Sequence, residues 1–225
     1  MKKIRILTIR FTNKMKIDEM PYLRGAINKR LTDAHIDFHN HSDDDKLVYR
    51  YPLIQYKIID NLACLVCLEH GAESIHSFFK VQNYEVNVGK RKEELIIDNI
   101  DINNHFLDFR ETYFEYRIHH WLALNEDNYK EYLQLREKNE KIYFLENILI
   151  GNIWGFAKNL DFEIKERIRL SILDIKKEMV KPYKGTKMHA ITLDFRTNLH
   201  LPADIGLGKG VSVGFGIVAP KKSKK

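Results

Sequence analysis

Two histidines, His39 and His41, lie in a polar segment with Asn40 between them. In an extended chain, residues two apart point to the same face with backbones about 7 Å apart, which leaves room for a phosphodiester between the imidazoles. Histidine titrates near neutral pH and can serve as general base or general acid. In RNA, a base removes the 2′-OH proton, the oxygen attacks the adjacent phosphorus, and an acid protonates the departing 5′ oxygen. This chemistry needs no metal and leaves a 2′,3′-cyclic phosphate and a 5′-hydroxyl.

A metal site is the alternative for the same segment. The segment from His39 to Asp44 approximates the His-x-His-x-Asp-His motif of metallohydrolases, although Asp44 stands where the last histidine would be, and His39, His41 and an aspartate could form the site. Imidazole and carboxylate together suit zinc. A solvated polar loop without a role is the third interpretation. We expect no metal and no cofactor.

The two cysteines, Cys64 and Cys67, lie within the apolar run of residues 62–68. Residues three apart in a strand point to opposite faces, so this pair is poorly placed to form a disulfide or to bind one ion. Free cysteines are usually buried. We expect both to be core residues.

A glycine-rich run near the C-terminus is the second feature with chemical potential. Closely spaced glycines let a backbone approach an anionic ligand and offer consecutive amide N–H groups, and Lys209 adds charge. The run lacks Gly-Lys-Ser/Thr and does not open a helix, which excludes a P-loop and a dinucleotide fingerprint. A glycine-rich turn with nothing bound stays open as the alternative. The glycines of the run are Gly206, Gly208, Gly210, Gly214 and Gly216.

The overall charge favours a polyanionic partner. The 225-residue chain has a formal net charge of +6 and ends in a lysine-rich tail. Each lysine or arginine set against a phosphate releases condensed counterions. Arg24, Lys187 and Arg196 are candidate phosphate contacts by charge.

The composition is that of a globular protein, with 44% hydrophobic and 30% charged residues. Residues 1–11 alternate like a strand and lack a cleavage site, so they do not indicate a signal peptide. No apolar stretch approaches the roughly 18 residues that cross a bilayer. We expect a cytoplasmic protein without a membrane partner.

The order of the expected elements predicts two similar halves. Strands at 4–11, 47–59, 62–68 and 84–97 and helices at 21–33 and 71–80 give the order β, α, β, β, α, β, which is ferredoxin-like. The second half has expected strands at 106–122, 164–175 and 187–199 and a helix-rich stretch at 128–158. We therefore predict an α+β protein of two tandem ferredoxin-like (RRM-like) domains, residues 1–102 and 103–225.

Over nearly its whole length, and most clearly at both ends, the chain resembles the RAMP superfamily of CRISPR-associated RNA-binding proteins. The resemblance rests on the glycine-rich loop followed by Gly-Phe-Gly (residues 214–216) and on the early helix sequence Tyr-Leu-Arg-Gly-Ala-Ile (22–27). Within this superfamily, the histidine pair and the following Arg-Tyr-Pro-Leu-Ile-Gln-Tyr-Lys (50–57) are similar to the CRISPR repeat-processing endoribonucleases. The resemblance implies metal-independent cleavage of repeat RNA to release guide RNAs in antiviral defence, with the glycine loop holding the RNA.

The resemblance also implies roles for individual residues. It assigns catalysis to the two closely spaced histidines, His39 and His41, and makes His35 an alternative. Tyr49 and Lys29 flank the pair in sequence; Tyr49 would position the 2′-OH or a phosphate oxygen, and Lys29 would offset charge on the phosphorane. Both also have ordinary interpretations, as a strand residue and a solvated helix lysine.

Two functions follow as hypotheses. The first is a repeat-processing endoribonuclease whose partner is CRISPR repeat RNA, acting as a homodimer or with a CRISPR effector complex. The second is a non-catalytic RAMP subunit that holds RNA in an effector complex without cutting it. The histidine pair favours the first, because a pure binder has no need of it.

Overall fold

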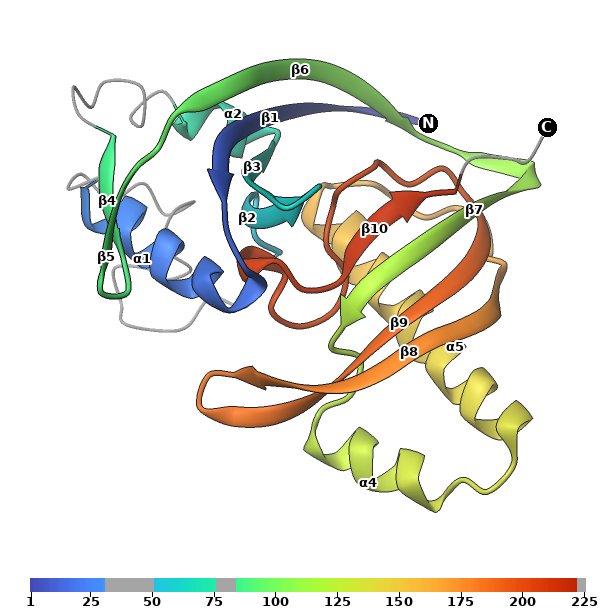
Figure 1. Ribbon diagram of the computed structural model, residues 1–225. Helices are drawn as coiled ribbons and strands as arrows, with labels where there is room; N and C mark the ends of the chain where they lie inside the picture. Colours follow the sequence, from blue (N-terminus) through green and yellow to red (C-terminus); the bar gives the residue numbers. More distant parts are fainter. Residues whose placement is uncertain (31–50, 76–83, 222–225) are drawn as a thin grey trace, which may run out of the picture. The chain divides into compact units, whose positions relative to one another are not determined.

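The computed structural model describes residues 1–30, 51–75 and 84–221 (Figure 1). The chain forms two compact units. The N-terminal unit comprises Lys3–His105 together with Ser212–Gly214, and the C-terminal unit comprises Met1–Lys2, Phe106–Val211 and Phe215–Lys225. Each unit contains a four-stranded sheet. The prediction of two ferredoxin-like α+β domains is confirmed.

The sheet of the N-terminal unit has the ferredoxin-like strand order β2-β3-β1-β6. Asp60 and Asn61 join β2 to β3 with φ values of 52° and 65°, the left-handed conformation that a two-residue hairpin turn needs. The apolar residues of β3 face the core on both sides, and Cys64 and Cys67 are buried and free, as predicted. The elements are β1 (Lys2–Lys14), η1 (Ile17–Glu19), α1 (Met20–Arg30), β2 (Ile54–Ile59), β3 (Leu62–Leu68), α2 (His70–Ser74), β4 (Glu85–Val88), β5 (Arg91–Glu94) and β6 (Ile97–Leu107).

The fourth strand of this sheet differs from the prediction. Residues 84–97 were expected to form one strand, but they contain the separate hairpin β4–β5, which turns at Gly89 with φ 63°. The fourth strand is instead β6, at Ile97–Leu107. The boundary predicted after residue 102 falls inside β6, so we propose a boundary a few residues later, at the end of that strand.

The C-terminal unit repeats the topology, with strand order β10-β7-β9-β8. Two helices connect the first two strands, and the glycine-rich segment occupies the connection where a ferredoxin-like fold has its second helix. The expected strand at 164–175 begins later and runs further, because β8 and β9 pair out to Tyr183 and Thr186. The elements are β7 (Phe109–Trp121), α4 (Glu126–Gln134), α5 (Lys138–Asn159), β8 (Leu170–Tyr183), β9 (Thr186–Leu199), η2 (Val211–Val213) and β10 (Ile217–Pro220).

Helix α5 covers one face of this sheet (Figure 1). It buries Leu145, Leu149, Ile153 and Phe156, which recur every three or four residues on one side of the helix. Trp121 at the end of β7 is fully buried, and its Nε1 donates a hydrogen bond to Asn152 Oδ1 at 2.9 Å. No helix in the described part of the chain is long and apolar enough to cross a bilayer.

Candidate nucleic-acid interface

Helix α1 leads directly into the segment with the predicted catalytic residues. His35, His39, His41 and Tyr49 lie outside the described residues, so their geometry stays a prediction. Lys29 is on the last turn of α1, and its side chain is exposed. The exposed ammonium group of Lys29 can reach a phosphate. A solvated lysine without a role, the alternative interpretation, would be exposed in the same way.

Arg24, in the middle of α1, contacts the glycine-rich segment within the N-terminal unit. Its Nη1 donates a hydrogen bond to Ser212 Oγ at 3.1 Å. Gly214, two residues further, has φ 88°, and a Cβ there would lie 3.3 Å from the carbonyl oxygen of Tyr56. The structure thus brings Arg24, a predicted RNA-binding residue, into contact with a residue of the glycine-rich segment. A guanidinium has five N–H donors, so the bond to Ser212 leaves Arg24 able to bind an anion.

The other four glycines of the run pack against their own chain in the C-terminal unit. A Cβ on Gly216 would lie 1.9 Å from the carbonyl oxygen of Leu207, and one on Gly208 would lie 2.7 Å from Nε1 of Trp121. Added Cβ atoms on Gly206 and Gly210 would meet Val211 at 2.5 Å and Phe215 at 2.9 Å. Packing therefore accounts for these glycines without a ligand, and their role in RNA binding stays a prediction.

Lys209 lies between these packed glycines. Its backbone N–H donates to the carbonyl oxygen of Leu122 at 3.3 Å, which fixes the loop, while its side chain is exposed. The run therefore offers an anion one exposed, flexible cation.

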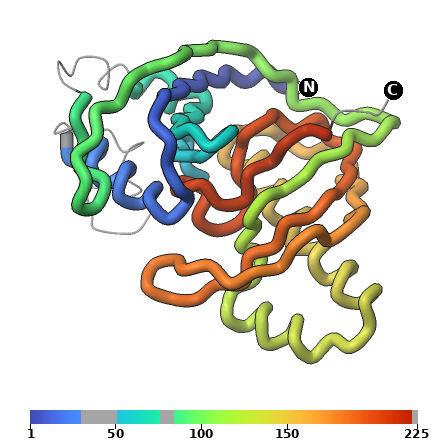
Figure 2. Tube along the Cα trace, in the orientation of Figure 1, coloured from blue at the N-terminus to red at the C-terminus, as the bar shows by residue number. Residues whose placement is uncertain are grey.

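The hairpin of β8 and β9 is a basic feature of which the sequence analysis singled out only Lys187. It extends away from the rest of its sheet (Figures 1 and 2), and its tip is Lys184-Gly185, with φ values of 48° and 78°. Among the described residues, Lys176 is the one hairpin lysine that forms ion pairs, with Asp174 and Asp194. The repeated lysine, together with a Lys-Gly turn, is the sequence signal that could have found it. The lysines are Lys176, Lys177, Lys181, Lys184 and Lys187.

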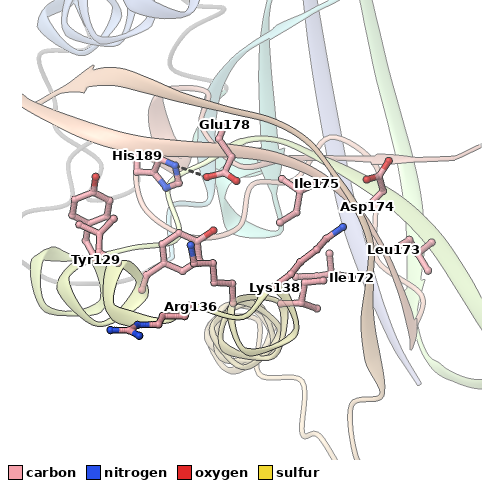
Figure 3. A pocket seen from close by; sticks show the side chains of 13 residues that line it. Tyr129, Arg136, Lys138, Ile172, Leu173, Asp174, Ile175, Glu178 and His189 are labelled. Carbon is pink, nitrogen blue, oxygen red and sulfur yellow. Dashed lines mark ion pairs between the residues drawn. The ribbon is translucent and has the colours of Figure 1, made fainter.

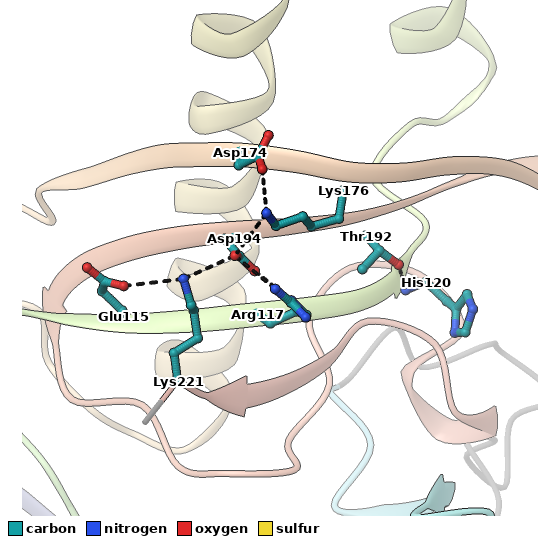
Figure 4. Close-up of polar contacts among 8 residues, drawn as sticks. All are labelled: Glu115, Arg117, His120, Asp174, Lys176, Thr192, Asp194 and Lys221. Atoms are coloured by element: carbon teal, nitrogen blue, oxygen red, sulfur yellow. Dashed lines mark hydrogen bonds and ion pairs between the residues drawn. The ribbon is translucent and has the colours of Figure 1, made fainter. Parts of the chain in front are cut away.

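His119 and His120 lie at an irregularity near the end of β7. His120 has φ 49°, and its backbone N–H donates to Thr192 Oγ1 at 3.1 Å (Figure 4). Burial lowers the pKa of His120, and the nearby charge of Lys181 lowers it further. Burial likewise lowers the pKa of His119. Both imidazoles are therefore neutral at neutral pH, beside the basic hairpin.

A buried carboxylate ties the strands of this sheet together. Asp194 on β9 is 3% exposed and accepts two hydrogen bonds from Arg117 on β7, at 2.6 and 3.0 Å (Figure 4). Lys221, directly after β10, pairs with it at 3.1 Å, and Lys176 on β8 lies 3.9 Å away. The hydrogen bonds from Arg117 hold the pKa of Asp194 below its usual range. These three cations are committed to the fold, which sets them apart from the other four lysines of the hairpin.

Within residues 1–30, 51–75 and 84–221, no group of three or more histidine, cysteine or acidic side chains is arranged to hold a metal ion. The alternative metal site at His39, His41 and an aspartate of the same segment lies outside those residues.

Two models of protein-family domains match this chain. The model of the Cas6b N-terminal domain matches residues 2–105, and the model of the Cas6b C-terminal domain matches residues 108–221. The chain belongs to the Cas6b family. This membership confirms the resemblance to the CRISPR repeat-processing endoribonucleases of the RAMP superfamily.

Solved structures share the fold of this Cas6b family member. A crystal structure of Cas6b superimposes with a TM-score of 0.89 at 26% identity, over 98% of this chain and all of the other. A crystal structure of the CRISPR RNA processing endoribonuclease Cas6b gives a TM-score of 0.75 at 24% identity, with the same coverage. Thermus thermophilus Cse3, bound to an RNA representing a pre-cleavage complex, gives 0.51 at 12% identity, over 98% of this chain and all of that one.

One relative is more similar in sequence but over a shorter stretch. The uncharacterized protein MJ0978 of Methanocaldococcus jannaschii is 42% identical over 98 residues, which are 44% of this chain. The matching part spans 65% of the length of that relative.

Proposed function

We propose that this Cas6b family member is a metal-independent endoribonuclease that cleaves CRISPR repeat transcripts and releases guide RNAs. The observation that carries the proposal is the match of both Cas6b domain models, at residues 2–105 and 108–221. A Cas6b with 24% identity to this chain is named as a CRISPR RNA processing endoribonuclease.

In the proposed reaction, His39 and His41 act as the general base and the general acid. The base takes the proton of the 2′-OH, the 2′ oxygen attacks the phosphorus, and the acid protonates the leaving 5′ oxygen, so that a 2′,3′-cyclic phosphate forms. Tyr49 positions the 2′-OH or a phosphate oxygen. Lys29, exposed on the last turn of α1, offsets the negative charge that builds on the phosphorane.

The RNA is held by separate basic groups. Arg24 on α1 and the exposed Lys209 contact phosphates in this proposal, together with the lysines of the β8–β9 hairpin. Charges on a protruding hairpin can follow an RNA backbone over several phosphates, because all of its lysines except Lys176 form no ion pair within the described structure. The net charge of +6 adds attraction at longer range.

The mechanism is tested with repeat RNA from the source genome in the presence of EDTA. We expect cleavage to continue in EDTA and the upstream product to end in a 2′,3′-cyclic phosphate. An RNA with a single 2′-deoxy substitution 5′ of the cut should bind as tightly but stay intact. Cleavage of the deoxy substrate, or loss of cleavage with EDTA, would rule out attack by the 2′-OH without a metal.

The residue assignment is tested separately. The double variant His39→Ala, His41→Ala should lose cleavage by at least about 10²-fold and keep RNA binding. His70→Ala is the matched control, because His70 is an exposed histidine on α2 whose ring pairs with Glu73. A double variant that cleaves at the wild-type rate contradicts the site. A wild-type protein that binds but never cuts supports the non-catalytic RAMP subunit.

A further inference from the structure

A cavity of about 540 Å³ lies in the C-terminal unit, beside α4 and the beginning of α5 on one side and β8 and β9 on the other (Figure 3). The volume is within the range of sites that hold a small organic ligand. None of the residues assigned to catalysis or to RNA binding lines it. Its lining combines aromatic rings, aliphatic side chains and charged groups.

Aromatic rings form one wall of the cavity. Tyr129 and Tyr132 of α4 lie 5.8 and 5.9 Å from the ring of His189 on β9, measured between ring centroids. Tyr132 is 5% exposed and therefore fixed, whereas Tyr129 is 40% exposed and offers ring surface to a ligand. Aliphatic side chains of β8, Ile172 and Ile175, add apolar surface. A planar ring system that stacks on an aromatic side chain is the ligand that suits such a wall.

Three cationic side chains also line the cavity: Arg136, Lys138 and Lys141. None of them lies within ion-pair distance of a carboxylate in the described part of the chain, although the charge of Lys138 acts on Asp174 and Lys141 Nζ lies 5.3 Å from the centroid of Tyr132. Of the two carboxylates in the lining, Asp174 pairs with Lys176, and Glu178 contacts His189, which carries a charge only when it is protonated. The three cations outnumber the one carboxylate without a lysine or arginine partner, so the net charge at the cavity is positive, which suits an anionic group such as a phosphate.

Glu178 adds a polar group with a defined direction. One of its carboxylate oxygens, Oε2, lies 2.8 Å from Nε2 of His189. This contact orients the imidazole, and Oε1 remains as an acceptor in a carboxylate that is 42% exposed. Adenine, cytosine and guanine present N–H donors on their pairing edges, and a carboxylate accepts from such donors. Uracil has an N–H group but lacks the exocyclic amino group.

From these contacts we infer that the cavity beside α4 and β8 binds a single nucleotide, with its base against Tyr129 and its phosphate on Arg136 and Lys138. The nucleotide is a residue of the bound RNA, and this last step alone rests on the proposed function. Glu178 makes the site prefer bases with an amino group. The site therefore selects one nucleotide of the RNA.

The full-length protein is titrated with AMP, GMP, CMP and UMP, up to about 10 mM, and with inorganic phosphate as the competing anion. Binding is followed by saturation-transfer NMR on the nucleotides. We expect saturable binding, weakest for UMP, with phosphate displacing the nucleotides only at much higher concentration. The absence of saturable nucleotide binding, or phosphate competing as well as AMP, overturns the inference.

Variants locate the binding in the cavity. Tyr129→Ala and Arg136→Ala should each weaken AMP binding about tenfold, since each removes a stacking or a phosphate contact. Their controls are Tyr143→Ala, an exposed tyrosine of α5 outside the cavity, and Arg167→Ala, an exposed arginine outside it. Glu178→Gln should raise the affinity for UMP relative to CMP. Equal losses in the control variants overturn the inference.

The two proposals can fail separately. Nucleotide binding is measured without RNA and without cleavage, so a wild-type protein that binds AMP but leaves repeat RNA intact refutes the endoribonuclease and keeps the nucleotide site. Cleavage of repeat RNA by a protein that binds no mononucleotide gives the opposite result. Unchanged tryptophan fluorescence of each variant confirms that the C-terminal unit is folded.

Discussion

Replacing Gly216 by alanine tests whether the glycine-rich run is required by packing. Gly216 has φ 67°, and its Cβ would lie 1.9 Å from the carbonyl oxygen of Leu207. The neighbour cannot rotate away, because it is backbone: the N–H of Leu207 donates to the carbonyl oxygen of Gly216 at 2.9 Å. The left-handed conformation costs alanine about 1–2 kcal/mol, and overpacking costs about 1–3 kcal/mol more. We expect a loss of about 2–5 kcal/mol in the free energy of unfolding.

Gly151→Ala is the matched control. Gly151 lies in the exposed part of α5, and a Cβ there would meet nothing within 4 Å. Glycine in a helix interior is less stable than alanine by about 0.5–1 kcal/mol, so this substitution should stabilise the C-terminal unit by that amount. The same chemical change thus has opposite expected signs at the two positions.

The assay is urea unfolding followed by tryptophan fluorescence. The chain has two tryptophans, Trp121 and Trp154, and both belong to the C-terminal unit, so the signal reports that unit alone. The midpoint should fall for Gly216→Ala and rise for Gly151→Ala. A Gly216→Ala variant within about 0.5 kcal/mol of the wild type would refute the packing argument. It would then favour a ligand as the reason for glycine there.

Three further predictions concern the charges and the core. Changing four hairpin lysines to alanine should lower the slope of log affinity for RNA against log salt by up to about 3, measured by fluorescence anisotropy, whereas changing Lys158 and Lys165 should not. Asp194→Asn should lower the free energy of unfolding by about 1–3 kcal/mol near neutral pH. Because folding lowers the pKa of Asp194, the carboxylate stabilises the fold above about pH 4, and this stabilisation is lost as the pH falls through the pKa of the folded state. The stability of the variant, measured by acid unfolding, should therefore depend less on pH than that of the wild type. Cys64 and Cys67 are both buried, and burial raises the pKa of the Cys67 thiol. Neither thiol should therefore react with Ellman's reagent until the protein is unfolded. The four lysines are Lys177, Lys181, Lys184 and Lys187.

Local sequence signals predicted the elements whose formation depends on local chemistry. The apolar run that became β3 and the Asp60-Asn61 turn before it need only neighbouring residues to be recognised. The hairpin β4–β5 was missed because its turn, at Gly89, interrupts a stretch that alternates like one strand. The fourth strand of the N-terminal sheet was then placed one element too early, because the strand order depends on pairing with β1, which is far away in the sequence.

The glycine-rich run shows why residue type and function are hard to connect from sequence alone. A glycine is required wherever a neighbouring atom leaves no room for a Cβ, and the neighbour can be a ligand or the chain itself. For Gly208 that neighbour is Trp121, which is 87 positions away in the sequence, so no local pattern could distinguish packing from phosphate binding. The aromatic cavity poses the same problem, because Tyr129 and His189 meet only after folding.

The C-terminal unit has two kinds of positive charge, those paired with a carboxylate and those without such a partner, and the sequence alone does not distinguish them. In the sequence, Arg117 and Lys221 look as suitable for a phosphate as Lys184 does. In the structure, Arg117 and Lys221 pair with Asp194, as does Lys176 of the hairpin. The other four hairpin lysines and the cations that line the cavity form no ion pair with a carboxylate in the described residues. Removing a cation that is paired with a carboxylate lowers the stability of the fold, whereas removing an unpaired cation lowers the affinity for an anion. Measuring both quantities for the same variants therefore separates the cations that hold the fold from those that bind RNA.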